Sequence, residues 1–86
     1  MNVTYRIDKE ILYIAIEGRI DASNAAEAED KIFSIKNANP GKHTVVDADK
    51  LTYISSAGLR VILRLRKEDP NLQLLMLRRM FTKFLI

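Results

Sequence analysis

The feature that most constrains this sequence is an abrupt junction between an apolar segment and an amphipathic one. The apolar segment 51–54 is typical of a short strand, and a helical pattern opens at Leu59. The four residues between them are Ser-Ser-Ala-Gly, at 55–58. The first backbone N–H groups of a helix lack intrahelical partners, and the helix dipole is positive there. The junction therefore predicts a strand-to-helix turn that places a serine where a phosphate is accommodated.

Patterns on both sides of the junction predict alternating strands and helices. Strands are expected at 3–7, 12–16, 43–46, 51–54 and 72–77. One helix should start within 21–24 and stop at 37–41, and a second should run over about 57–67. The first two strands should form an antiparallel hairpin, with Val3, Tyr5 and Ile7 on a buried face and Glu17-Gly18 ending the second strand. With 51–54 taken as a continuation of the third strand, the order β-β-α-β-α-β indicates an α/β fold with a mixed sheet.

Each predicted helix has an expected start and an expected buried face. Asn24 and Glu27 have capping-box spacing, and Ser23 is an alternative cap. The buried stripe of the first helix should comprise Ala25, Ala28, Ile32 and Ile35. On the second helix, one face should be marked by Leu59, Ile62, Leu63 and Arg66. Another face carries a basic stripe, expected either to be solvated or to contact an acidic partner: Arg60, Arg64 and Lys67.

Composition narrows the functional classes. A chain of 86 residues indicates a single domain, 1–86. The absence of cysteine excludes disulfides and thiolate ligands, and a lone histidine, His43, argues against a zinc site or a histidine-based catalytic triad. We therefore expect no cofactor and no metal. A net charge of +3 is weak evidence for nucleic-acid binding, and no apolar run is long enough for a membrane span. Without a signal-peptide pattern, the expected location is the cytoplasm.

Three motifs together resemble one known family. Residues 53–63, Tyr-Ile-Ser-Ser-Ala-Gly-Leu-Arg-Val-Ile-Leu, resemble the signature of STAS domains, the fold of anti-sigma factor antagonists and sulfate transporter tails. Gly-Arg-Ile-Asp at 18–21 resembles the family's second motif, and Val-Val-Asp at 45–47 matches the strand that leads to the serine. The resemblance implies a STAS-like mixed β-sheet with helices packed on it. It also implies a shortened final helix, because only 78–86 remain after the last predicted strand.

The resemblance implies a set of site residues. In bacterial antagonists the phosphorylated hydroxyl lies two residues before the glycine of the Gly-Leu pair, and Ser56 holds that position here. The family usually has Asp immediately before this serine. This chain has Ser55 there, which makes Ser55 the second-choice acceptor. The implied partner-binding residues are Asp21, which matches an acidic residue beside the phosphosite, with Asn24, Ser55, Gly58 and Arg60.

The resemblance also implies a mechanism. The unphosphorylated chain would bind an anti-sigma factor that is itself an ATP-dependent serine kinase, and so release a sigma factor. The kinase would then phosphorylate Ser56, the complex would dissociate, and a serine phosphatase would reset the chain. The phosphate is expected beside Asp21 and Asp47, with Arg60 available to pair with it. With no ATP-binding loop and no catalytic set, the chain is expected to be a substrate and not an enzyme.

Other interpretations remain open. Helix capping alone explains a serine at this turn. A STAS-type scaffold or regulatory module that binds another protein or a small ligand, without a phosphorylation cycle, is the main rival. An enzyme would need a base beside Ser56, and none lies near it in the sequence. The short tail should leave apolar surface uncovered, which favours a homodimer.

Overall fold

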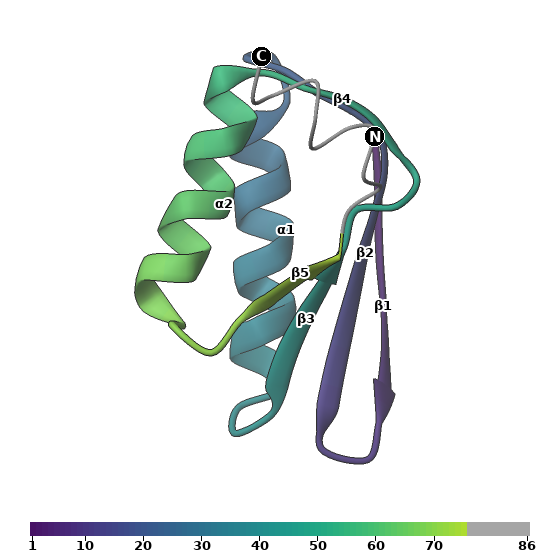
Figure 1. Ribbon diagram of the computed structural model, residues 1–86, viewed down its shortest axis with the longest axis vertical. Coiled ribbons are helices and arrows are strands. Elements are labelled where there is room, and N and C mark those ends of the chain that lie inside the picture. Colours follow the sequence, from purple (N-terminus) through teal and green to yellow (C-terminus); the bar gives the residue numbers. More distant parts are fainter. Residues whose placement is uncertain (76–86) are drawn as a thin grey trace.

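The computed structural model describes residues 1–75, and in these residues two helices cover one face of a five-stranded sheet (Figure 1). In chain order the elements are β1 (Asn2–Asp8), β2 (Ile11–Ile20), α1 (Ala25–Ala38), β3 (His43–Asp47), β4 (Leu51–Ile54), α2 (Ser56–Glu68) and β5 (Gln73–Leu75). The expected α/β fold with a mixed sheet is confirmed. The expected short final helix over 78–86 lies outside the described residues.

The sheet is organised around β2, its longest strand. β1 pairs with β2 in antiparallel fashion, and β3 and β4 both pair with β2 in parallel. β3 lies along residues 11–15 of β2, whereas β4 lies along residues 18–20. β5 adds a short parallel edge beside β3. Segment 51–54 is therefore a strand of its own, where the sequence pattern had suggested a continuation of β3.

The prediction that Glu17-Gly18 ends the second strand is wrong. β2 continues to Ile20, and its pairing register with β4 shifts between Gly18 and Arg19. Gly18 has φ 90°, a conformation that glycine adopts without the steric cost that other residues meet. The glycine therefore bends the strand at this irregularity and carries it on to a second partner.

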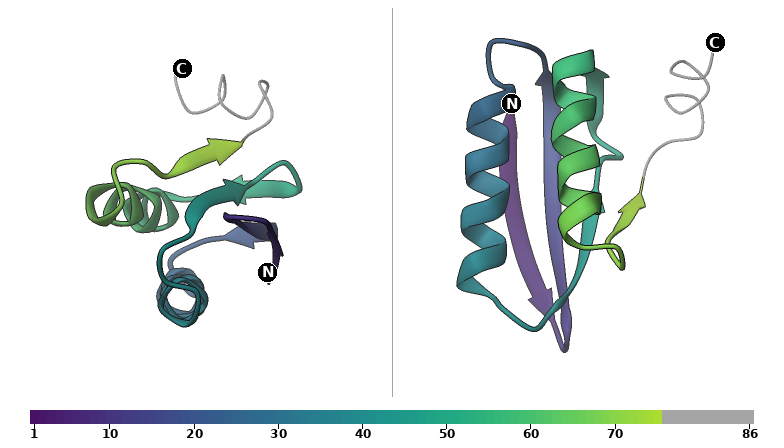
Figure 2. Two further views of the ribbon diagram at one scale, coloured as in Figure 1. Left: turned by 90° about the horizontal axis from the view of Figure 1, so that it is seen from below. Right: turned by 90° about the vertical axis from the view of Figure 1, so that its left-hand side faces the viewer.

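The hydrophobic core lies between the sheet and the two helices, the two layers that Figure 2 shows from other sides. The alternate β2 residues Leu12, Ile14 and Ile16 are fully buried. On α1, burial of Ala25, Ala28 and Ile32 confirms the predicted stripe, with Ile35 only partly buried at its end. Each large apolar side chain buried in this layer contributes roughly 1.5–3 kcal/mol.

The apolar face marked by the sequence on the second helix only partly coincides with the buried face. Leu59 and Ile62 pack against the core, whereas Leu63 is 67% exposed. The fully buried apolar side chains of α2 are Val61 and Leu65. The first turn of α2 fixes how the helix is rotated about its own axis, because buried Gly58 lies against the end of β4. Residues three and seven positions after this glycine share its face, which brings Val61 and Leu65 inward.

The buried face predicted for β1 is only partly formed. Val3, Tyr5 and Ile7 pair with the helix-facing residues of β2, but Tyr5 is 54% and Ile7 45% exposed. The alternation of the sequence therefore identified the correct face. It did not reveal that β1 is an edge strand, and that α1 covers only the end of it near Val3.

Candidate functional site

Two parallel strands end side by side at the candidate site. Ile20 of β2 and Ile54 of β4 are register partners, and the Ser55 N–H donates to the carbonyl oxygen of Ile20 at 2.9 Å. The next residue after Ile20 is Asp21. The pairing therefore brings the Asp21 loop next to the Ser55-Ser56 turn, although about 35 positions separate them in the sequence.

The two serines of the turn have different roles. Ser55 is the N-cap of α2, and its Oγ accepts a hydrogen bond from the Gly58 N–H at 3.3 Å. Ser56 is the first residue of α2 and its side chain is exposed. The capping interpretation is thus confirmed for Ser55. The hydroxyl of Ser56 stands in solvent at the positive end of the helix dipole.

Gly58 allows α2 to approach the strand ends closely. A Cβ atom at this position would lie 2.6 Å from Cγ1 of Ile54 and 2.8 Å from Cγ2 of Ile20. A side chain here would force Ile54 and Ile20 to move, so glycine favours this close packing. Gly58 is buried, and its expected contact with a partner stays a prediction.

The Asp21 carboxylate is held by the loop that follows it. One of its oxygens accepts hydrogen bonds from the Ser23 hydroxyl and from the Ser23 N–H, the latter at 2.9 Å. These bonds, Ser23 Oγ first, lower the pKa of Asp21 below its usual value of 3.8, and the nearby charge of Arg19 acts in the same direction. Asp21 is therefore negatively charged at neutral pH beside the serine turn.

The capping box predicted for α1 is not formed. Asn24 occupies the N-cap position, but its side chain makes no capping hydrogen bond to the helix. Its Oδ1 instead accepts from the Asp21 N–H at 2.9 Å, and its Nδ2 donates to the Arg19 carbonyl oxygen at 3.0 Å. The amide thus closes the loop that carries Asp21, and any contact of Asn24 with a partner stays a prediction.

A groove of about 230 Å³ between the two helices adjoins the turn. Its lining is mainly small side chains: Ala22, Ala25, Ala26, Ala57 and Val61. Charged groups line it as well, since Arg64 of α2 forms an ion pair with Glu29 of α1 at 2.9 Å and Arg60 stands one turn nearer the serines. Sequence reasoning missed Glu29, because nothing in the spacing shows that these helix faces meet.

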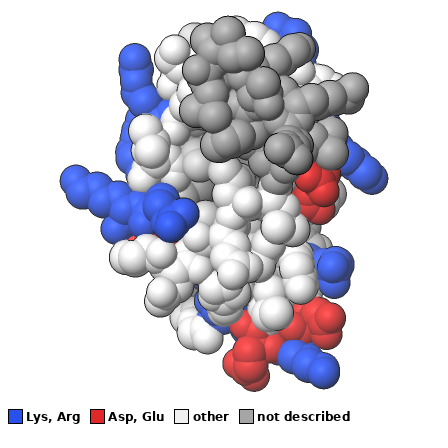
Figure 3. All heavy atoms as spheres, viewed as in Figure 1, with Lys and Arg blue, Asp and Glu red and all other residues white. Residues whose placement is uncertain are grey.

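Basic side chains lie along the flank of the molecule that α2 occupies, and others lie on the opposite flank and at the bottom of the same view (Figure 3). Of the stripe predicted at 60, 64 and 67, Arg64 is paired with Glu29. Arg60 and Lys67 are exposed, and no ion pair is found for them among residues 1–75. The stripe is therefore partly neutralised by α1, and Arg60 is the basic group of α2 nearest to Ser56 along the chain.

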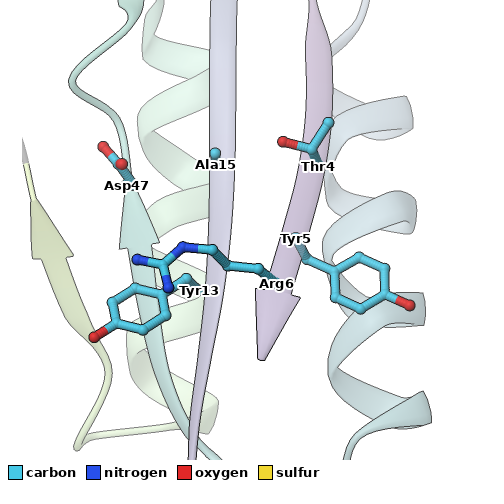
Figure 4. A pocket seen from close by; sticks show the side chains of 6 residues that line it. All are labelled: Thr4, Tyr5, Arg6, Tyr13, Ala15 and Asp47. Atoms are coloured by element: carbon cyan, nitrogen blue, oxygen red, sulfur yellow. The ribbon is translucent and has the colours of Figure 1, made fainter. Parts of the chain in front are cut away.

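The expectation that Asp47 lies beside the serine turn is wrong. Asp47 of β3 is the register partner of Ala15 of β2. The serine turn begins next to Ile20, five residues further along β2. Asp47 borders a hollow of about 120 Å³ on the face of the sheet opposite α1 and α2, lined also by Thr4, Tyr5, Arg6, Tyr13 and Ala15 (Figure 4). One carboxylate oxygen of Asp47 also accepts from the Asp49 N–H at 3.0 Å, so this side chain holds the turn that follows β3.

The structure thus brings Asp21, Ser55, Ser56 and Gly58 together and places Asn24 behind the Asp21 loop. In the part of the chain that is described, no cluster of His, Cys, Asp and Glu side chains is suited to holding a metal ion. No helix within residues 1–75 has the length and apolar character needed to cross a membrane.

Comparisons with known proteins agree on one fold. Residues 2–76 match the STAS domain family. The fold is similar to an anti-sigma factor antagonist from Mycobacterium paratuberculosis, with a TM-score of 0.76 and 15% identity over 87% of this chain and 66% of that chain. It is also similar to the anti-sigma factor antagonist SpoIIAA in its unphosphorylated form, with a TM-score of 0.60 and 18% identity over 90% and 73% of the two chains.

A third solved structure, Mglu, has a TM-score of 0.62 and 13% identity over 85% of this chain. This chain covers only 18% of Mglu and just under two thirds of the mycobacterial antagonist. No curated protein sequence matches it. The structural likenesses show a shared fold, whereas the family match extends over nearly the whole described sequence. This chain therefore belongs to the STAS domain family.

Proposed function

We propose that this chain is an anti-sigma factor antagonist controlled by phosphorylation of Ser56. In the unphosphorylated state it binds an anti-sigma factor that is a serine kinase, and this binding releases a sigma factor for transcription. Phosphorylation ends the interaction, and a serine phosphatase restores the binding state. The chain supplies the acceptor hydroxyl and no catalytic group, and it acts in the cytoplasm.

The observation that carries this proposal is the division of roles between the two serines. The Ser55 hydroxyl is engaged by the Gly58 N–H, whereas Ser56 is exposed on the first turn of α2. A kinase would therefore reach the Ser56 hydroxyl without breaking a capping hydrogen bond. Ser55 is the poorer acceptor, because its phosphorylation disturbs the cap.

Electrostatics support a switch that acts on binding and leaves the fold intact. A phosphate adds roughly −1.5 to −2 charges at pH 7, and the helix N-terminus is a favourable place for that charge. The same charge changes a docking surface that already contains ionised Asp21. If the phosphate costs a docked complex about 3 kcal/mol, binding weakens roughly a hundredfold.

The direct test is phosphorylation of the purified chain by an anti-sigma factor kinase encoded near its gene. After incubation with ATP, peptide mass mapping should place a single phosphate on Ser56. Ser56→Ala should abolish the modification, and Ser55→Ala should retain it. A phosphate on Ser55 alone, or the same extent of modification in Ser56→Ala, would contradict the assignment.

The switch itself is tested by binding of the same kinase. Ser56→Ala should bind in the presence or absence of ATP, and Ser56→Asp should bind poorly. An acidic residue in the first turn stabilises a helix by about 0.3–1 kcal/mol, so lost binding by Ser56→Asp would not reflect unfolding. Equal binding by the wild type and both variants would eliminate the switch.

A second candidate function is a STAS scaffold or regulatory module without a phosphorylation cycle. Two observations favour it: Ser55 stands where the family usually has Asp, and the small-residue groove beside the turn is suited to a protein segment or small ligand. A partner that binds the wild type and Ser56→Asp equally, with no phosphate on either serine, would support this alternative.

A further inference from the structure

We propose that two copies of this chain associate through the outer edges of their β1 strands, in antiparallel register about Tyr5. The two sheets would then join into one continuous sheet. This inference concerns the edge of the sheet and is independent of the proposed phosphorylation of Ser56.

The first argument is the direction of the backbone groups along β1. The His43 N–H donates to the Glu10 carbonyl oxygen at 2.9 Å, which fixes how the parallel pair β2–β3 is bonded. Because backbone direction alternates along a strand, Tyr13 and Ala15 turn their N–H and C=O groups away from β3 and toward β1. Their register partners Arg6 and Thr4 are thereby bonded inward.

The remaining residues of β1 follow from the same alternation. Val3, Tyr5 and Ile7 direct their N–H and C=O groups away from β2, toward the outer edge. Within residues 1–75 no strand pairs with that edge, because β1 is the last strand of the sheet on this side. The strand therefore presents a row of unpaired donors and acceptors, which is a template for another strand.

The second argument is that the same three residues carry the exposed apolar side chains of β1. Tyr5 is 54% and Ile7 45% exposed, on the helix-facing side of the sheet. Figure 4 shows the Tyr5 side chain extending away from β2 while Arg6 reaches back across β2. An incoming strand would gain hydrogen bonds and apolar contacts from the same residues.

The third argument is the lack of the usual protection against edge pairing. Natural edge strands are commonly shortened, bulged, or interrupted by Pro or Lys. β1 is seven residues long, pairs with β2 without a register shift, and contains no Pro, Gly or Lys. Its one basic side chain, Arg6, is held over the Tyr13 ring at 4.0 Å and so points away from the edge. The opposite edge strand, β5, is only three residues long.

The occupant that fits this edge is a second copy of the same strand. An antiparallel pair centred on Tyr5 places Tyr5 opposite Tyr5 of the other copy, and Val3 opposite Ile7. These residues are the ones whose backbone groups point outward, so the pair would form about six inter-chain hydrogen bonds. On the other face, Thr4 lies opposite Arg6 and Asn2 opposite Asp8, with no like charges directly opposed.

The symmetry of this pairing provides a sharp test. Sedimentation velocity or light scattering across a dilution series should show the wild type changing from one chain to two as concentration rises. Tyr5→Lys and Tyr5→Glu should each stay at the mass of one chain, because like charges then face each other at the two-fold axis. An equimolar mixture of the two variants should recover the mass of two chains.

Leu63→Lys is the matched control, since Leu63 is a 67% exposed apolar residue on α2, away from the edge. It should associate like the wild type. As a second readout, a short bifunctional thiol reagent should link two chains of the Tyr5→Cys variant, because paired Cα atoms about 5.5 Å apart lie within its reach. The chain has no other cysteine. A wild type that stays at one chain throughout, a Tyr5→Lys variant that still associates, or a mixture that does not recover would overturn the proposal.

Discussion

A Cβ atom on Gly58 would lie 2.6 Å from Cγ1 of Ile54, so the helix that presents Ser56 is packed directly against the strand that precedes it. Packing against the strand therefore explains why glycine occupies the last position of the Ser-Ser-Ala-Gly stretch, without reference to any partner. The glycine sets how closely α2 approaches the sheet and hence where the exposed serine stands.

The first prediction concerns this contact. Gly58→Ala should destabilise the fold by about 1–3 kcal/mol, because overpacking outweighs the gain of roughly 1 kcal/mol in helix propensity. Urea unfolding measures the change. Ile54→Ala removes the opposing Cγ1, so the double variant should lose less than the sum of the two single losses. Additive losses would show that the clash is not the cause.

The second prediction separates the two serines by stability alone. Ser55→Ala removes the cap of α2 and should cost about 1 kcal/mol. Ser56→Ala removes an exposed hydroxyl and should change stability by less than about 0.5 kcal/mol. Thermal unfolding of both variants, side by side, decides this. Equal losses would contradict the assignment of the cap to Ser55.

The third prediction concerns the loop that carries Asp21. Asn24→Ala removes the acceptor for the Asp21 N–H and the donor to the Arg19 carbonyl, so the loop should open and the fold should lose about 1–3 kcal/mol. Amide hydrogen exchange at Asp21 should accelerate in this variant. Ala26→Ser, on an exposed position of α1, is the control and should leave that exchange rate unchanged.

The fourth prediction concerns how the stability of the fold depends on pH. Lys36 of α1 binds Asp69, the C-cap of α2, at 3.0 Å. Burial raises the pKa of Asp69, but the hydrogen bond and charge of Lys36 outweigh it and keep this pKa below 3.8. When folding lowers the pKa of a carboxyl group, the group stabilises the fold at pH values above its pKa in the unfolded chain. This stabilisation is lost as the pH falls through the pKa in the folded chain.

The wild type should therefore lose this contribution, at most about 1 kcal/mol for a partly exposed pair, as pH falls below 3.8. Asp69→Asn should be less stable at pH 7 and show a weaker decline in acid, as measured by urea midpoints at several pH values. Glu27→Gln, which breaks the exposed pair with Lys31, is the control. A decline in Asp69→Asn as steep as in the wild type would contradict the prediction.

Much of the fold was predictable because local patterns agree with the final packing. The alternation of Val3, Tyr5 and Ile7 identified one face of β1, and Ala25, Ala28 and Ile32 gave the inner face of α1. What local patterns could not give was the placement of whole elements. The degree of burial on β1 depends on which strand lies at the edge.

The incorrect predictions also arose because local patterns do not reveal how whole elements are placed. Gly18 looked like a strand end, although its positive φ serves a bend that carries β2 on to β4. The face marked on α2 by Leu59 and Ile62 packs on the core but omitted the fully buried Val61 and Leu65, because the rotation of the helix depends on the contact of Gly58 with Ile54. Asn24 looked like a cap, yet its amide is used by the loop before the helix. The nearness of Asp21 to the serine turn was implied by family resemblance, since spacing alone does not reveal the pairing of distant strands.

The pairing of Ile20 with Ile54 also sets when the site first exists during synthesis. Residues 21 and 55 approach each other only through a parallel pair that needs both strands, so an N-terminal fragment that ends before β4 lacks the serine turn. Such distant pairing forms late, because the intervening chain must first close as a loop. A nascent chain on the ribosome would therefore not place the serine turn beside Asp21 until α2 has emerged and docked.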